Sequence, residues 1–438
     1  TATFRRDGSS RFGDNNKYGN FPSFALGYNI SNEKFFEDSG TSDVINKLKL
    51  RASWGLTGNS EIPVYNSIAN LSEYNYVFNG QFVLGLADAR LGNPDLKFES
   101  TTMRNIGIEA SFFNSRLNLT LDYFQNDTDD LLLFVSIPSS LGFDSVLKNS
   151  GSLENKGFEV DLNGYLIDNQ DFKINVAGNI SFLRNEITSL GGSTPFFSSV
   201  PDTHLGVTGS WVAPGNPIGV WRGFDYIGIF QSKEEIANNA SRSGDKPGYP
   251  QYRDVNGDGE ITTDDYVIIG DPNPDFTWGL NTNLTYKNFE LGIFIRGSQG
   301  FDVRNLQASE LGDGVQKINQ ISSILTNSWT PDNRDATRPV IDAGRDFANS
   351  YRDSDYFIED GSFIRLQNIS LGYVLPKFND FISRARIYAS GQNLLTITDY
   401  TGFDPEVNNR GQNNLNRGDD YDAYPKSRTF TVGINLEF

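Results

Sequence analysis

The chain of 438 residues contains no cysteine, and histidine occurs once, at His204. Without cysteine there is no disulfide framework, no thiol nucleophile and no zinc–thiolate site. A single histidine also excludes a cluster of histidine metal ligands. Basic residues are in deficit, because 37 Lys and Arg stand against 55 Asp and Glu, which gives a formal net charge of −18. This balance argues against a nucleic-acid partner, which a basic surface would attract.

Long apolar runs are missing as well. The segment 131–135 is among the longest, far short of the roughly 20 apolar residues that a membrane-spanning helix needs. A strand of a membrane β-barrel needs only about 9–11 alternating residues and escapes such a scan. No signal peptide is evident, and residues 1–4 read as the middle of a strand. We therefore expect the chain to begin within a longer protein.

The sequence is rich in aromatic residues and glycine, and it contains segments in which apolar and polar residues strictly alternate. Phe, Trp and Tyr make up 13% of the residues and glycine occurs 43 times, a composition typical of strands and turns rather than helices. The clearest alternation lies near residue 438, where polar or small residues separate apolar ones that share one strand face. Those apolar residues are Phe430, Val432, Ile434, Leu436 and Phe438. Such a segment needs a neighbouring strand to pair with.

The same alternation predicts strands along most of the chain. Turns at 114–115, 168–169 and 287–288 join three pairs into hairpins, and Asn-Gly at 79–80 indicates a shorter one. A slip of phase at 367–368 predicts a β-bulge. The predicted strands are 1–6, 23–30, 47–57, 103–113, 116–125, 131–137, 156–166, 171–183, 277–286, 289–296, 363–375, 385–391 and the segment up to 438.

Short turns alternate with long connections at 188–217, 231–274, 300–355 and 396–425. The third contains a pattern near the helical period within 303–329, where we expect an amphipathic helix. Tight turns at one rim and long loops at the other are typical of an outer-membrane barrel. We therefore predict an all-β fold, a transmembrane antiparallel β-barrel with polar inward faces and long extracellular loops. Stacked β-sandwich domains, which also have polar outer faces, are the alternative.

Segment 254–265 has the ligand spacing of an EF-hand calcium loop, without evident flanking helices. Oxygen ligands at loop positions 1, 3, 5, 7 and 12 around a glycine suit a hard cation. We predict a structural Ca²⁺ site; an Asx-rich turn that binds nothing tightly is the alternative. The candidate ligands are Asp254, Asn256, Asp258, the Glu260 carbonyl and Asp265, with Gly259 at the turn. No catalytic pattern rises above background, so we do not expect an enzyme.

Five further stretches follow one another in a distinctive order. They are FRRDGSSRFG at 4–13 with FPSF at 21–24, LKLRASWGLTG at 48–58, IGIFQ at 227–231, the segment 254–265 followed by IGDPNP at 269–274, and GSFIRL at 361–366 through LGY at 371–373. In this order they resemble the SusC/RagA-type TonB-dependent transporters of Bacteroidetes. The resemblance covers the chain from residue 4 to residue 438.

The resemblance implies a 22-stranded barrel in outer-membrane lipid, an N-terminal plug and a SusD-like surface lipoprotein as a lid. It also implies import of oligosaccharides or peptides, driven through TonB. The plug and the first barrel strands are not in this sequence, so we expect residues 1–438 to form the C-terminal part of the barrel, with TonB reached through the absent part. A secreted, calcium-binding β-domain adhesin is the alternative function.

Overall fold

The computed structural model describes all residues except 14, 139, 141, 144, 199–206, 315–317, 343–350, 377–380, 407–410 and 412; His204 lies outside the described residues. The chain divides into two compact units. Unit 1 comprises Thr1–Tyr165, Ser181–Pro195 and Ala213–Asn216, and unit 2 comprises Leu166–Ile180, Phe196–Val212 and Pro217–Phe438. Within the described ranges, no helix combines the length and the apolar character needed to cross a bilayer.

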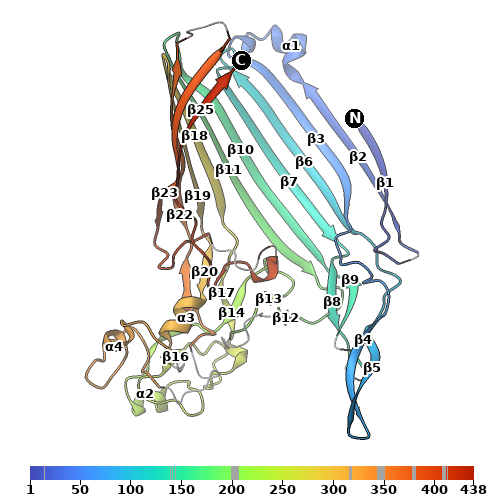
Figure 1. The fold of residues 1–438 in the computed structure, drawn as a ribbon, viewed down its shortest axis with the longest axis vertical. Helices are drawn as coiled ribbons and strands as arrows, with labels where there is room; N and C mark the ends of the chain where they lie inside the picture. Colours follow the sequence, from blue (N-terminus) through green and yellow to red (C-terminus); the bar gives the residue numbers. More distant parts are fainter. Residues whose placement is uncertain are drawn as a thin grey trace. The chain divides into compact units, whose positions relative to one another are not determined.

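Twelve strands form the main sheet, in the order β1-β2-β3-β6-β7-β10-β11-β18-β19-β22-β23-β25 (Figure 1). Sheet neighbours follow one another along the chain, as antiparallel strands joined by turns do. The predicted strands of this sheet are confirmed, several with longer ends. Their bounds are β1 Ala2–Gly8, β2 Tyr18–Asn29, β3 Ile45–Asn59, β6 Glu99–Phe112, β7 Leu117–Asp129, β10 Ser152–Asp168, β11 Phe172–Ser189, β18 Phe276–Tyr286, β19 Phe289–Gln299, β22 Phe363–Leu375, β23 Arg384–Thr398 and β25 Thr429–Glu437.

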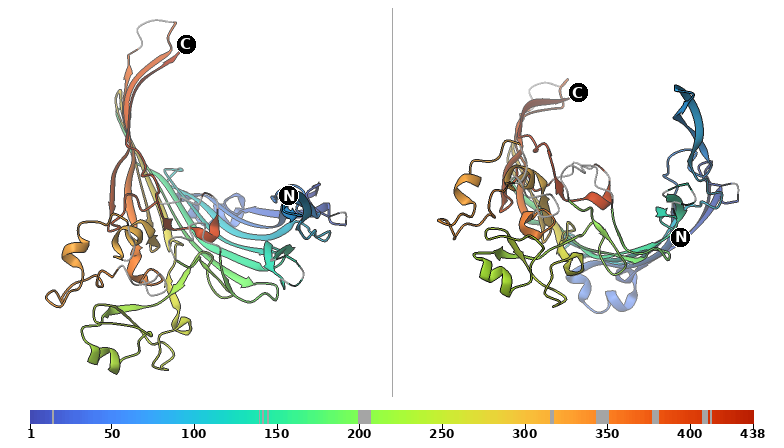
Figure 2. Two further views of the ribbon diagram at one scale, coloured as in Figure 1. Left: turned by 60° about the horizontal axis from the view of Figure 1, so that its bottom comes forward. Right: turned by 90° about the horizontal axis from the view of Figure 1, so that it is seen from below.

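The remaining elements are short and belong mostly to the long connections. In unit 2 they gather at one end of β18, β19 and β22 (Figure 1 and Figure 2). The short strands are β4 Asn70–Phe78, β5 Gln81–Arg90, β8 Leu132–Ser136, β9 Ser145–Asn149, β12 Phe196–Phe197, β13 Trp211–Val212, β14 Trp221–Gly223, β15 Tyr226–Ile229, β16 Pro250–Tyr252, β17 Val267–Gly270, β20 Asp302–Asn305, β21 Ile358–Asp360 and β24 Asp419–Asp420. The helices are α1 Lys34–Glu37, α2 Lys233–Asn238, α3 Leu306–Gly312 and α4 Ile324–Asn327, with 3₁₀ turns that include η5 Thr263–Asp265.

The predicted helix within 303–329 is wrong in extent. The structure has two short helices there instead: α3, capped by the Asn305 side chain, which accepts a hydrogen bond from the backbone of Ala308 at 2.8 Å, and the four-residue α4. Gly314 adopts φ +70 two residues after α3 ends, and this left-handed conformation cannot continue a right-handed helix. The backbone therefore turns before the apolar period at Ile318, Ile321, Ile324 and Leu325 begins, and of these four residues only Ile324 and Leu325 lie in a helix, α4.

Two local predictions are confirmed. Strands β4 and β5 pair across Asn79 and Gly80, whose φ values of 51 and 73 are those of a type I′ hairpin turn. The bulge predicted at 367–368 lies between Leu366 and Asn368, where the register of β22 against β23 shifts.

The sheet has an apolar face that is exposed and a polar face on which charged side chains pair with one another. On the apolar face, Leu26 is 73% exposed and Phe430 is 77% exposed, whereas on the polar face Asp122 and Arg365 are buried. A soluble sheet does the reverse, because it buries its apolar side against a core. Buried apolar clusters lie in the connections instead. They are Phe12, Ile62, Leu96, Phe98 and Leu147 in unit 1, and Phe224, Tyr252, Ile261, Tyr351 and Phe357 in unit 2.

Candidate functional site

The polar face of unit 1 carries an ion pair that crosses a strand. Arg51 of β3 donates from Nη2 to Asp122 Oδ2 of β7 at 2.5 Å. Between them, Gly107 of β6 is in register with both residues. A Cβ atom at Gly107 would lie 2.5 Å from Asp122 Oδ1 and 2.7 Å from Arg51 Nε. The glycine is therefore required for the arginine to reach across β6.

Unit 2 repeats this arrangement. Glu290 of β19 accepts hydrogen bonds from Arg384 at 2.8 Å and Arg386 at 2.7 Å, both on β23, across the intervening strand β22. Gly372 of β22 leaves the space, since a Cβ there would lie 2.6 Å from Arg386 Nη2. The abundance of glycine in the sequence indicates turns and strands but does not single out these two positions. Their role here is visible only once the strand register is known.

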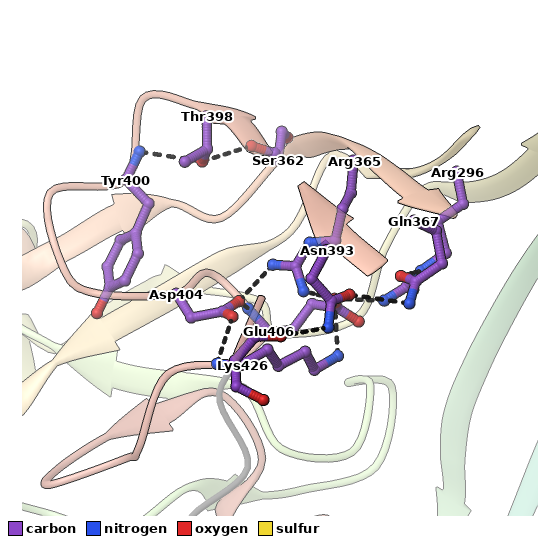
Figure 3. A network of polar contacts seen from close by, with 11 residues as sticks. Arg296, Ser362, Arg365, Gln367, Asn393, Thr398, Tyr400, Asp404, Glu406 and Lys426 are labelled. Atoms are coloured by element: carbon purple, nitrogen blue, oxygen red, sulfur yellow. Dashed lines mark hydrogen bonds and ion pairs between the residues drawn. The ribbon is translucent and has the colours of Figure 1, made fainter. Parts of the chain in front are cut away.

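A larger network ties the connection 399–428, between β23 and β25, to the polar face (Figure 3). Glu406 lies at its centre, and its Oε2 atom contacts three cations: Arg365 Nη1 at 2.8 Å, Lys426 Nζ at 2.8 Å, and Arg296 Nη2. Arg365 also donates from Nη2 to Asp404 Oδ1 at 2.6 Å. We refer to Arg296, Arg365, Asp404, Glu406 and Lys426 as the Glu406 network.

The bulge supports this network. Gln367 accepts a hydrogen bond from Arg296 Nε at 2.8 Å and donates to Asn393 Oδ1 at 2.9 Å. Asn393, which has φ 52, donates in turn to the Ser427 carbonyl at 3.0 Å. Bulges commonly redirect a side chain in this way. The irregular register thus fixes Arg296 and the connection 399–428 at the same time.

Both carboxylates of the network are charged at neutral pH. Burial by itself raises the pKa of Asp404, but the Glu406 backbone N–H and the Arg365 guanidinium outweigh it and hold that pKa below its ordinary value. Burial likewise raises the pKa of Glu406, while hydrogen bonds from Arg296 and Lys426 lower it further than burial raises it. Hydrogen bonds and cations that favour the charged form explain both directions.

Several loop aromatics form a structural core in unit 2. The Arg242 guanidinium lies 4.2 Å from the Phe224 ring centroid and 4.4 Å from that of Tyr252, so that it makes a cation–π contact with each of these two adjacent rings. Burial raises the pKa of the adjacent Tyr266 to about 12. Phe224, Tyr351 and Phe357 therefore pack inside the connections of unit 2 rather than facing a ligand.

The predicted calcium loop is ordered by its own backbone. Asp265 is fully buried, and its carboxylate accepts hydrogen bonds from the backbones of Val255 and Thr262, both at 2.9 Å. Asp254 accepts from the backbones of Gly257 and Gly259 at 2.7 and 2.9 Å. Among the described residues, no group of three or more His, Cys, Asp or Glu is placed to hold a metal. Asn256, Asp258 and Glu260 are exposed, and the Ca²⁺ site stays a prediction.

Comparison with known proteins places this arrangement among receptors. Residues 1–291 match a family model described as TonB dependent receptor-like, beta-barrel. The chain is 40% identical to TonB-dependent receptor P3 of Formosa agariphila and 32% identical to SusC of Bacteroides thetaiotaomicron; each match covers all of this chain and 44% or 42% of the relative. The solved RagAB peptide transporter superposes with a TM-score of 0.82 at 29% identity, over all of this chain and 45% of that one. The chain thus spans less than half the length of these relatives.

Proposed function

The chain belongs to the TonB-dependent receptor β-barrel family, SusC/RagA type, of the bacterial outer membrane, and from this premise we propose that it forms part of an importer of oligosaccharides or peptides. The exposed apolar face is the observation that carries the proposal. A sheet that exposes apolar residues such as Leu26 and Phe430 on one face and pairs its charges on the other is suited to lipid on one side and a polar lumen on the other.

We place the substrate path along the polar face. The cross-strand ion pairs and the Glu406 network line this face, and polar substrates exchange water for such groups at low cost. Transport of this kind needs no catalysed reaction in the barrel. The proposed energy source is TonB, which we expect other parts of the full protein to contact. We assign residues 1–438 to the C-terminal part of the barrel.

The long connections at one end of the strands are the proposed docking surface for a SusD-like lipoprotein. RagAB, one of the solved relatives, is a peptide transporter. From it we carry over to this chain the role in transport but not the identity of the substrate. Family membership favours import over the secreted adhesin considered from the sequence. Whether sugar or peptide is carried is decided by experiment.

The test uses the full-length gene in its own cells. Uptake of labelled oligosaccharides and of labelled peptides is compared between the parent, a deletion strain and the complemented strain, with a protonophore to abolish the energy supply. We expect one ligand class to be lost on deletion, restored by the gene and blocked by the protonophore. Unchanged uptake of both classes, or release of the protein into the medium, would refute the proposal.

A further inference from the structure

The Glu406 network has the geometry of an occupied anion site. Three cations, Arg296, Arg365 and Lys426, converge on the single oxygen Oε2 of Glu406 (Figure 3). One carboxylate oxygen seldom needs three cations for charge balance. Guanidinium and ammonium groups gathered in this way are the usual means of recognising a carboxylate.

Glu406 and two of its three cations come from different parts of the fold, while Lys426 lies on the same connection as Glu406. Arg296 and Arg365 lie on the strands β19 and β22, whereas Glu406 lies on the connection 399–428. A movement of this connection can withdraw the carboxylate and leave both arginines in place. If only the Glu406 side chain turns away, with Asp404 still paired with Arg365 and Lys426 in place, the site retains three positive charges against one negative charge.

The site is reachable and has unused donor capacity. The Lys426 side chain is 42% exposed and that of Arg296 is 29% exposed, so an anion can approach them from solvent. Arg365 is buried, and its Nε has no hydrogen-bond acceptor among the described residues. A buried N–H donor without an acceptor costs free energy. A ligand carboxylate that lies deeper in the site than the Glu406 carboxylate can accept a hydrogen bond from Arg365 Nε.

We propose that Arg296, Arg365 and Lys426 form a subsite for a carboxylate of the transported substrate, and that Glu406 occupies this subsite until the substrate displaces it. The proposal rests on the import function above and deepens it. It assigns acidic ligands, such as uronate-bearing oligosaccharides or acidic peptides, as the preferred substrates over neutral ones.

The uptake test uses the full-length transporter with its partners in whole cells. Each acidic ligand is paired with a neutral counterpart of the same length: an oligouronate with its carboxyl-reduced form, and a glutamyl peptide with its glutaminyl form. We expect Lys426→Gln and Arg296→Gln to lower acidic uptake relative to neutral uptake by about tenfold, the usual effect of losing one charge-assisted bond. The control is Lys34→Gln, an exposed cation of α1 that lies outside both the polar face and the network; it should leave the ratio unchanged.

A second measurement does not depend on transport. In the purified full-length protein, Glu406→Gln empties the subsite of its carboxylate, and acetate serves as the probe. We expect acetate, compared with chloride at equal ionic strength, to raise the melting temperature of this variant but not of the wild type. An equal response of both proteins, or an unchanged acidic-to-neutral uptake ratio in folded Lys426→Gln, would overturn the subsite. If the wild type imports neither ligand class, the import proposal fails while the acetate result still decides the subsite.

Discussion

Replacing Gly107 by alanine should break the ion pair between Arg51 and Asp122. The added Cβ would stand 2.5 Å from Asp122 Oδ1 and 2.7 Å from Arg51 Nε, so one of the two side chains must move. Loss of a hydrogen bond between charged groups costs roughly 1.5–3 kcal/mol. Arg51 is partly exposed, and solvent screening places the expected loss toward the lower half of that range. We therefore expect about 2 kcal/mol of destabilisation.

Reversible urea unfolding of the full-length barrel in lipid vesicles measures this loss, as a shift of midpoint at constant slope. The matched control is Gly27→Ala. Gly27 lies in the same row, in register with Arg51, but the nearest atom to its added Cβ is the flexible Lys49 Cε at 3.3 Å. In an Asp122→Asn background the effect of Gly107→Ala should shrink, because the pair is already weakened. Equal effects of the two glycine substitutions, or an undiminished effect in that background, would refute the reasoning.

Three further expectations follow from the connections. Asp265→Asn should destabilise its segment by about 1–2 kcal/mol, because one of two accepting oxygens is lost; calorimetric Ca²⁺ titration should show binding to the wild type that this variant lacks. The depressed pKa values of Asp404 and Glu406 mean that their stabilisation is present above about pH 4 and is lost as pH falls through the lower folded values. Proteolysis within 399–428 should therefore accelerate below about pH 4, and a rate independent of pH there would contradict this. Gly80→Ala should weaken the β4–β5 hairpin by roughly 0.5–1 kcal/mol, because φ is +73 there; faster amide exchange in the hairpin is the measurement.

The strands and their two faces could be predicted from the sequence because both follow from alternation within one segment. The strand from Phe430 to Phe438 could be predicted without knowing which strand pairs with it, and the same holds for the Asn79-Gly80 turn. The bulge at Gln367 was also predictable, since it interrupts the alternation itself. These features are local, and local periodicity carries them.

The Glu406 network could not be predicted in this way. Its members Arg296, Arg365 and Lys426 are separated by 60 residues or more along the chain, and only register and loop path bring them together. The single helix predicted within 303–329 is wrong for a related reason, because the apolar spacing at 318–325 does not report that α3 has already ended before the left-handed backbone at Gly314. The ion pairs that pass over Gly107 and Gly372 likewise depend on the register of three neighbouring strands, which the sequence alone does not give.

The bulge between β22 and β23 has a consequence for assembly. A slip of two residues between neighbouring strands keeps every apolar side chain on the correct face, so alternation alone cannot reject that mistake. Gln367 and Asn393 can meet Arg296 and Ser427 in one alignment only, since the extra residues interrupt the ladder at a single place. During insertion into the membrane, we expect this irregularity to disfavour misaligned strand pairings that hydrophobicity alone would accept.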